Sequence, residues 1–164
     1  QLRKVAFAIK NSSTILLPRW RIICKELALT VRMMPRDVKT RWNLTYDMLE
    51  FALEYRLALD KITDERSSNL QDYEMDKKEW KIAAELRDIL KDGTLYFSRN
   101  GVPNLTTVIP AMDHIDSVMT ANIESNKYSP AIQAALGVGQ RTLNRYYGKT
   151  DYSETYRVAM SKSN

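Results

Sequence analysis

The sequence predicts an all-α protein, a multi-helix bundle of about six to seven helices joined mostly by short loops. Apolar residues recur at helical spacing almost throughout the chain. Only 5 glycines and 5 prolines occur in 164 residues, too few for the many tight turns of an all-β protein. Hydrophobic residues make up 44% and charged residues 27%, as in ordinary globular proteins. We expect residues 1–164 to form a single helical domain.

Breaks in the apolar pattern separate the first helices. Residues 2–10 carry one apolar face, and a second apolar run covers residues 13–30. Pro35 stops the second run, so residues 38–42 are expected to form an extended or irregular connector. One long helix should then cover residues 43–62, capped by Asn43 or Thr45. Its apolar stripe steps by three and four residues and comprises Leu44, Met48, Phe51, Ala52, Tyr55, Leu59 and Ile62.

Further helices are expected after a polar loop at residues 64–76. The second long helix should run from about Lys77 to Arg99, weakened near its end by Gly93. Next comes a helix that Thr106 or Thr107 opens and Asn126 ends. Ser129 followed by Pro130 has the order of a cap and a first helical residue, and predicts a helix that Gly148 interrupts. A last short helix is expected over residues 153–161.

The charge is unevenly distributed along the chain. Residues 1–41 hold ten Lys/Arg and two acids, a balance of +8. Residues 42–127 hold ten Lys/Arg and sixteen acids, a balance of −6, and residues 128–164 hold five and two, a balance of +3. Any contact with a polyanion is therefore expected at the two ends, although an unevenly charged solvated surface would give the same pattern.

The sequence offers little for membrane insertion or self-contained catalysis. No apolar run is long enough for a membrane span, and no secretory signal is recognisable. The single cysteine, Cys24, lies among apolar residues and predicts a buried thiol in a reducing, intracellular compartment. The only histidine, His114, lies between Asp113 and Asp116, where an exposed polar helix face is favoured over a metal site. We assign no catalytic residue and no metal site to this chain.

One segment resembles a known family. The run Asp37-Val38-Lys39-Thr40-Arg41-Trp42-Asn43, followed by Thr45-Tyr46-Asp47-Met48-Leu49, is similar to the D-V-x-T-R-W-N-S-T-Y-x-M-L signature of hAT transposases. Downstream, KDGTLYFSRNGVPNLTTVIPAMDHID and KYSPAIQAALGVGQRTLNRYYGKTD look like the fungal branch of that family. Residues 35–160 carry the resemblance well, and residues 1–34 carry it only weakly.

The resemblance implies a fragment of a larger enzyme. The family has an RNase H-like catalytic core with a DDE triad and Mg²⁺, and an all-α domain inserted in that core. This chain would belong to the inserted domain, without DDE acids of its own, so it would not be an enzyme alone. The implied partners are DNA, as a transposon end or hairpin, and the rest of the transposase in the nucleus, with no membrane and with the oligomeric state open.

The resemblance also implies a DNA-binding site. Trp42 would stack on a base flipped out near the catalytic centre, which offsets lost base stacking by ~1–3 kcal/mol, and Arg41 would meet a phosphate. The basic residues Arg32, Arg36 and Lys39 should share one solvent-facing surface with them. The alternative is that Trp42 packs in the core at the start of its helix, and the two interpretations are not exclusive.

Several positions depart from the family pattern. Leu44 replaces a small serine, the helix containing Gly93 is a few residues shorter than in relatives, and Gly137 and Gly139 interrupt a helical run. A family Cys-x-x-His motif would precede this chain, and a Leu-His-Pro segment would follow it. These departures keep two alternatives open, a domesticated helical protein-interaction module and a non-functional transposon remnant. The first predicts an exposed apolar patch, and the second predicts poor packing near Gly93.

Overall fold

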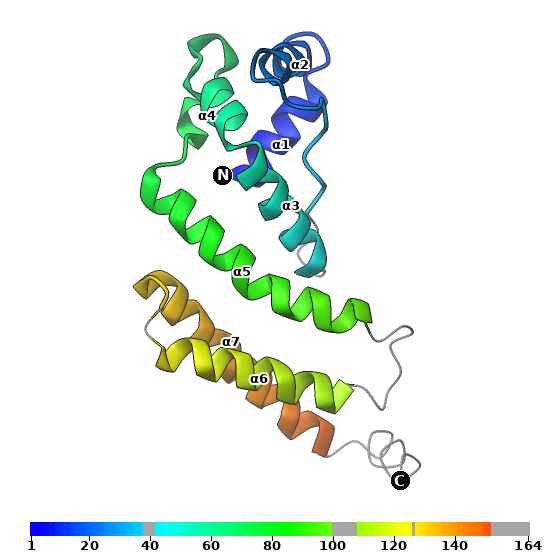
Figure 1. Cartoon of the computed structure of the whole chain (residues 1–164), viewed down its shortest axis with the longest axis vertical. Helices are drawn as coiled ribbons and strands as arrows, with labels where there is room; N and C mark the ends of the chain where they lie inside the picture. Colours follow the sequence, from blue (N-terminus) through cyan, green and yellow to red (C-terminus); the bar gives the residue numbers. More distant parts are fainter. Residues whose placement is uncertain (38–41, 100–107, 126, 152–164) are drawn as a thin grey trace. The chain divides into compact units, whose positions relative to one another are not determined.

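The computed structural model describes residues 1–37, 42–99, 108–125 and 127–151 (Figure 1). For residues 42, 92–99, 108–109 and 150–151 it describes the backbone alone. The described residues contain seven α-helices and no strand, so the predicted all-α class is confirmed. They divide into two compact units, Gln1–Leu90 and Lys91–Asn164, which are treated separately below. The single-domain organisation stays a prediction.

The first unit surrounds a continuous hydrophobic core. Its helices and 3₁₀ turns are α1 (Leu2–Asn11), α2 (Leu16–Glu26), α3 (Trp42–Glu54), α4 (Arg56–Asp64), η1 (Arg66–Ser68), η2 (Gln71–Tyr73) and α5 (Lys77–Arg99), of which α5 continues beyond the unit. The largest side chains with less than 2% exposure are Trp20, Tyr55, Ile23, Ile62, Val5 and Cys24. The predicted apolar stripe of residues 44–62 supplies much of this core, since all its members except the half-buried Leu44 are buried.

The second helix ends much earlier than Pro35, contrary to the sequence prediction. Ala28 adopts a left-handed backbone with φ 53°, and the N–H groups of Ala28 and Leu29 donate to the carbonyls of Lys25 and Cys24 at 3.1 and 2.8 Å. This is the Schellman arrangement that usually places glycine at the left-handed position. Because alanine stands there, the composition gave no warning of the helix end, and residues 28–37 form a connector instead.

The single helix predicted over residues 43–62 is wrong in one respect, because it is broken at Tyr55. The backbone of Tyr55 has φ −97° and ψ 19°, and α4 begins at the next residue. Its phenol, 1% exposed, donates to the carbonyl of Thr30 at 2.6 Å, which satisfies a hydroxyl that would otherwise be buried without a partner. Neither glycine nor proline marks this break. The helix also starts at Trp42, so Asn43 and Thr45 lie inside its first turn.

The polar loop at residues 64–76 is more ordered than predicted. It contains η1 and η2, and it buries Ser68 and Leu70. At its end Asp76 and Glu79 form a reciprocal cap. The N–H of Glu79 donates to Asp76 at 2.7 Å and that of Asp76 donates to Glu79 at 3.0 Å. Asp76 thus starts α5, which then runs without a break through Gly93, and its predicted range is confirmed.

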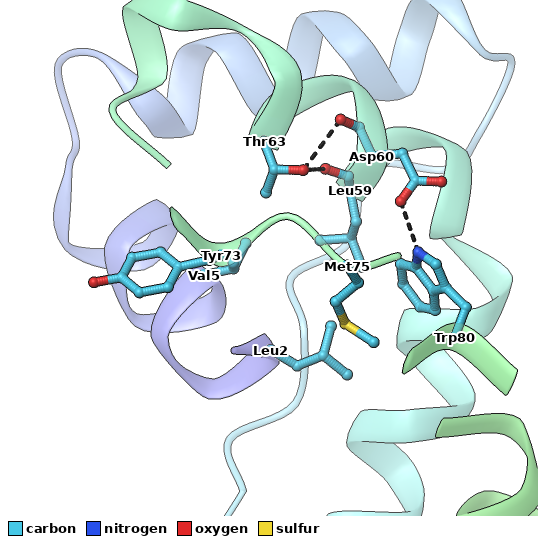
Figure 2. A pocket seen from close by; sticks show the side chains of 8 residues that line it. All are labelled: Leu2, Val5, Leu59, Asp60, Thr63, Tyr73, Met75 and Trp80. Carbon is cyan, nitrogen blue, oxygen red and sulfur yellow. Dashed lines mark hydrogen bonds between the residues drawn. The ribbon is translucent and has the colours of Figure 1, made fainter. Parts of the chain in front are cut away.

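Packing beneath this loop leaves almost no free space. A cavity of about 10 Å³ is lined by residues of α1, α4, the loop and α5 (Figure 2). Within it the indole N–H of Trp80 donates to the carboxylate of Asp60 at 2.8 Å, and the hydroxyl of Thr63 donates to the carbonyl of Leu59 at 2.8 Å. This volume suits a single water molecule and no larger ligand.

The second unit contains two helices packed against each other, α6 (Val108–Glu124) and α7 (Pro130–Asp151) (Figure 1). Pro130 is the first residue of α7, as its position after Ser129 predicted. The helix continues through Gly148, contrary to the expected interruption. The buried residues of the pair are Ala111, Met112, Tyr128, Ile132 and Leu136. The expected cap at Thr106 or Thr107, the end at Asn126 and the helix at 153–161 lie outside the described residues.

No helix in the described parts of either unit is long and apolar enough to cross a membrane.

The two glycines inside α7 have different surroundings. A Cβ at Gly139 would lie 3.2 Å from the Cε of Met119, so glycine permits a close approach of α6 there. A Cβ at Gly137 would meet only the Nη1 of Arg141, at 4.0 Å. Gly139 therefore has a packing role, whereas Gly137 lowers helix stability with no packing benefit among the described contacts.

We predict that Gly137→Ala stabilises the protein by about 0.5–1 kcal/mol, because alanine restricts the unfolded chain and suits a helix interior. Gly139→Ala, the matched control in the same helix, should gain less or destabilise, because Met119 must move by a few tenths of an ångström. Urea unfolding of both variants measures the difference. Equal stabilisation by the two substitutions would contradict the packing role of Gly139.

We also predict that Ala28→Gly stabilises the first unit by about 0.5–1 kcal/mol. The left-handed conformation costs an L-residue roughly 1–2 kcal/mol, and part of this gain is lost to the greater freedom of glycine in the unfolded chain. Ala6→Gly within α1 is the control and should destabilise by a similar amount. Thermal unfolding followed by circular dichroism tests this, and destabilisation by Ala28→Gly would rule out the left-handed helix end.

Candidate nucleic-acid interface

Two buried aromatic side chains hold the connector that leads to the Arg-Trp motif. Tyr55 donates to the carbonyl of Thr30, and the indole N–H of Trp20 donates to the carbonyl of Arg32 at 2.9 Å. Both donors are 1% exposed. Because residues 28–37 lack regular secondary structure, their polar backbone groups need partners of this kind. The core thus determines the path of the connector.

An aromatic cluster supports these two hydrogen bonds. The rings of Phe51 and Tyr55 stack with centroids 4.1 Å apart and an interplanar angle of 4°, and Trp20 lies 6.0 Å from Tyr55. The guanidinium of Arg32 lies 5.6 Å from the Phe51 centroid and bonds Glu54 at 3.4 Å. Arg32 therefore covers the edge of the core, and its positive charge is shared with a ring and a carboxylate.

The connector ends at Asp37, the first residue of the hAT-like signature. One carboxylate oxygen accepts a hydrogen bond from the hydroxyl of Thr45 at 2.7 Å, and the other pairs with the guanidinium of Arg3. The Asp37 side chain is 1% exposed, whereas that of Arg3 is 50% exposed. Two signature residues that flank the Arg-Trp pair are therefore joined to each other and to α1. We call Asp37, Thr45 and Arg3 the carboxylate clamp.

The five predicted DNA-binding residues are only partly described. Arg32 and Arg36 are both exposed on the connector. The structure does not describe Lys39, Arg41 or the side chain of Trp42. Trp42 is the first residue of α3, and its backbone is described. Their shared surface stays a prediction. Within the described part of the chain Arg36 has no ion-pair partner, which leaves its charge available for a phosphate.

Part of the basic charge of the first 41 residues pairs with carboxylates inside the first unit. Arg19 on α2 binds Glu65 through two guanidinium nitrogens and also reaches Glu26 at 3.3 Å. Its hydrogen bond lowers the pKa of the Glu65 carboxyl, and Lys61 lowers that of Glu26. Among the ten basic residues of this segment, Arg19 and Arg32 thus pair with later acids and Arg3 pairs with Asp37, so its charge is neutralised only in part.

The polar groups considered for chemistry form no recognisable centre. In the described ranges no three His, Cys, Asp or Glu side chains gather in a group that could hold a metal ion. Asp113 beside His114 accepts a hydrogen bond from Tyr147 at 2.5 Å. Cys24 is buried, as predicted, and its burial raises the thiol pKa.

Comparison with known families finds one match. Residues 2–89 match the model of the ZBED1 RNase-like helical domain. The chain belongs to this family. It is thereby part of the hAT/ZBED transposase-derived proteins, which confirms the predicted ancestry at this level. The matched span coincides with the first unit and contains the connector, the carboxylate clamp and the whole signature.

The match also revises the extent of the resemblance. Residues 1–34, which resemble the family only loosely in sequence, fall almost entirely within the matched helical domain. No curated protein and no solved structure matches the chain. The second unit, which carries the fungal-type segments, lies outside the matched residues.

Sequence reasoning missed the clamp and the aromatic supports. Asp37 and Thr45 both belong to the quoted signature. The one available indication was that a carboxylate and a hydroxyl, which can bond to each other, lie on either side of Trp42. Arg3 stands 34 positions earlier in the chain, and no local pattern connects it to Asp37. The sequence places Tyr55 only in an apolar stripe and does not single out Trp20, although a buried indole or phenol needs a hydrogen-bond partner.

We predict that Asp37→Ala destabilises the first unit by about 1–3 kcal/mol, because it removes a buried carboxylate with two partners and leaves the Thr45 hydroxyl without its acceptor. Asp47→Ala is the matched control, since Asp47 is an exposed aspartate on α3 and its loss should change stability by less than about 0.5 kcal/mol. Urea unfolding compares the two. Equal effects would show that the clamp contributes nothing to stability.

Proposed function

We propose that this chain is the helical insertion-domain part of a hAT-like transposase and contributes DNA contacts close to the catalytic centre of the parent enzyme. In this function Trp42 stacks on a base displaced from the double helix, and Arg41 binds an adjacent phosphate. The observation that carries the proposal is the carboxylate clamp within a family-matched domain, because it fixes both ends of the segment that holds the Arg-Trp pair.

The clamp suits this function because stacking on a flipped base requires an aromatic plane held in place beforehand. A base outside the double helix loses the stacking energy of its neighbours. An aromatic ring offsets this loss fully only when binding does not also have to order the ring, because such ordering costs conformational entropy. The connector reaches Asp37 on a path set by Trp20 and Tyr55, and α3 begins immediately after the signature's Arg41. Both neighbours of the proposed contact are thus anchored to the core.

The basic residues have different proposed roles. Arg36 is exposed and lacks an ion-pair partner in the described part of the chain, so it suits a phosphate contact beside the Arg-Trp pair. Arg32 already binds Glu54 and lies over Phe51, so its main contribution is to hold the connector. Lys39 would add a second phosphate contact. The phosphate contacts would fix the register of the DNA, whereas Trp42 would bind only where a base is displaced from the double helix.

The parent enzyme would supply the chemistry. We propose that this chain alone is not an enzyme, and that the DDE acids and their Mg²⁺ belong to the RNase H-like core of the parent. A nuclear location follows from the proposed work on chromosomal DNA. The fungal branch remains part of the proposal and rests on the segments of the second unit.

A protein-interaction module is the second candidate function. It is favoured by four large apolar side chains that are exposed. They are Phe7 on α1 at 71%, Leu57 on α4 at 70%, Ile15 directly before α2 at 62% and Ile22 on α2 at 48%. A degenerate remnant is less favoured, because the first unit has a closely packed core and α5 passes through Gly93 as one helix.

Tryptophan fluorescence tests the stacking proposal. Trp20 and Trp80 are 1% and 3% exposed with their N–H groups bonded inside the protein, so a DNA-dependent change is assigned to Trp42. We expect a hairpin DNA with one unpaired base to quench the emission at low salt. Trp42→Ala should abolish most of this change and weaken hairpin binding by about 5- to 150-fold, the equivalent of ~1–3 kcal/mol of stacking.

The control is the same hairpin with an abasic position in place of the unpaired base. It retains every phosphate, so it should bind the protein yet quench little. Unchanged emission with the intact hairpin at low salt would argue against the stacking site. Equal quenching by the abasic hairpin would show that the indole responds to the backbone and not to a base.

A further inference from the structure

We propose that the solvent-facing side of α7 is a binding site for the phosphate backbone of double-helical DNA. The site consists of Arg141, Arg145, Lys149 and Tyr146, which we call the α7 basic stripe. It lies in the second unit, outside the residues that match the family, and it does not depend on base stacking by Trp42.

The three cations form one row along the helix. Arg141, Arg145 and Lys149 recur every four residues, so each step turns by only about 40° around the axis and rises by about 6 Å. All three are exposed. The residues that pack against α6, such as the buried Ile132 and Leu136, lie roughly on the opposite side of α7. The stripe is therefore the outer face of a helix whose other face is already occupied.

Two of the cations converge on one aromatic ring. The guanidinium carbon of Arg145 lies 5.8 Å from the ring centroid of Tyr146, and the Nζ of Lys149 lies 5.7 Å from it. The Tyr146 side chain is itself half exposed, at 50%. Two like charges therefore contact the same exposed ring, and an anion that meets both would reduce their mutual repulsion.

The described acids of α6 lie away from the stripe. Asp113 accepts from Tyr147, and Asp116 accepts from the side-chain amide of Gln140 at 3.3 Å, both on the α6-facing side of α7. Burial and the Asp113 hydrogen bond raise the pKa of Tyr147, so its proton stays in this contact at neutral pH. Among the described residues no carboxylate pairs with the three cations of the stripe, and positive and negative groups thus lie on different sides of α7.

Stability of the helix does not account for this row. Cations near a helix C-terminus interact favourably with the helix dipole, but the effect is confined to the last turn. Lys149 is the basic residue of that turn, whereas Arg141 and Arg145 lie further inside α7. The helix dipole therefore does not explain Arg141 and Arg145.

The chemistry of the stripe favours DNA over an acidic protein surface. Protein interfaces are anchored by large apolar or aromatic groups in a desolvated centre, whereas DNA interfaces are more polar and strongly positive. The stripe has one neighbouring exposed apolar side chain, Val138 at 54%, and two arginines whose planar forks match phosphate oxygens. Such contacts carry no sequence preference, so we expect the site to bind duplexes generally.

Salt-dependent binding of the full chain to a labelled duplex tests the site. Replacing Arg141, Arg145 and Lys149 together by glutamine should lower the slope of log affinity against log salt by about 2.7, since each lost phosphate contact removes about 0.9. The control replaces Arg21, Lys25 and Arg66 by glutamine. These are also two exposed arginines and one exposed lysine, so the net charge changes equally, and their slope should stay that of the unmodified chain.

Equal slopes for the two triple variants would overturn the site, because net charge alone would then explain binding. Polyglutamate of the same charge should compete at least tenfold less well than duplex DNA, and equal competition would assign the stripe to acidic polypeptides instead. Trp42→Ala should keep the full duplex salt slope. A normal stripe result with no hairpin quenching would reject the stacking proposal alone, and the reverse outcome would reject this one alone.

Discussion

The path of the connector between α2 and α3 depends on hydrogen bonds from side chains of the hydrophobic core. At its end, the Asp37 carboxylate binds the side chains of Thr45 and Arg3. Residues without regular secondary structure need partners for their backbone groups, and two buried aromatics donate to the carbonyls of Thr30 and Arg32. The stacked Phe51 and Tyr55 rings fix one donor, and Trp20 fixes the other. Because these donors belong to the most buried residues of the unit, the connector cannot shift without disturbing the packing of α2, α3 and α4.

This dependence explains where sequence reasoning succeeded and where it stopped. Helical periodicity reveals α1, α5 and the apolar stripe of α3 and α4, because each buries one side of a regular helix. The two breaks, at Ala28 and Tyr55, lie at residues that are neither glycine nor proline, so the sequence does not mark them. A local signature likewise identified Asp37 and Thr45 as a set, but only the fold brings Arg3 to the same carboxylate.

Charge gives a second example of the same limit. A basic start beside an acidic middle resembles a polyanion-binding arm, yet Arg3, Arg19 and Arg32 each meet a carboxylate within the first unit. The smaller excess at the end of the chain is organised differently. There the described basic side chains of α7 share a helix face that meets no carboxylate in the described residues. The end of the chain has the smaller positive charge balance, yet its cations form the clearer row on one surface.

These two charge arrangements suit different parts of one task. A pairing network around the connector immobilises it, which favours a geometry-dependent contact such as stacking on a displaced base. An unpaired row on a helix face, by contrast, releases counterions on meeting phosphates and tolerates any sequence or register. A protein that works on distorted DNA needs both, since general backbone affinity brings a duplex within reach and a rigid platform then selects the deformed position. The clamped connector and the basic helix face therefore match the two kinds of contact that the proposed activity requires.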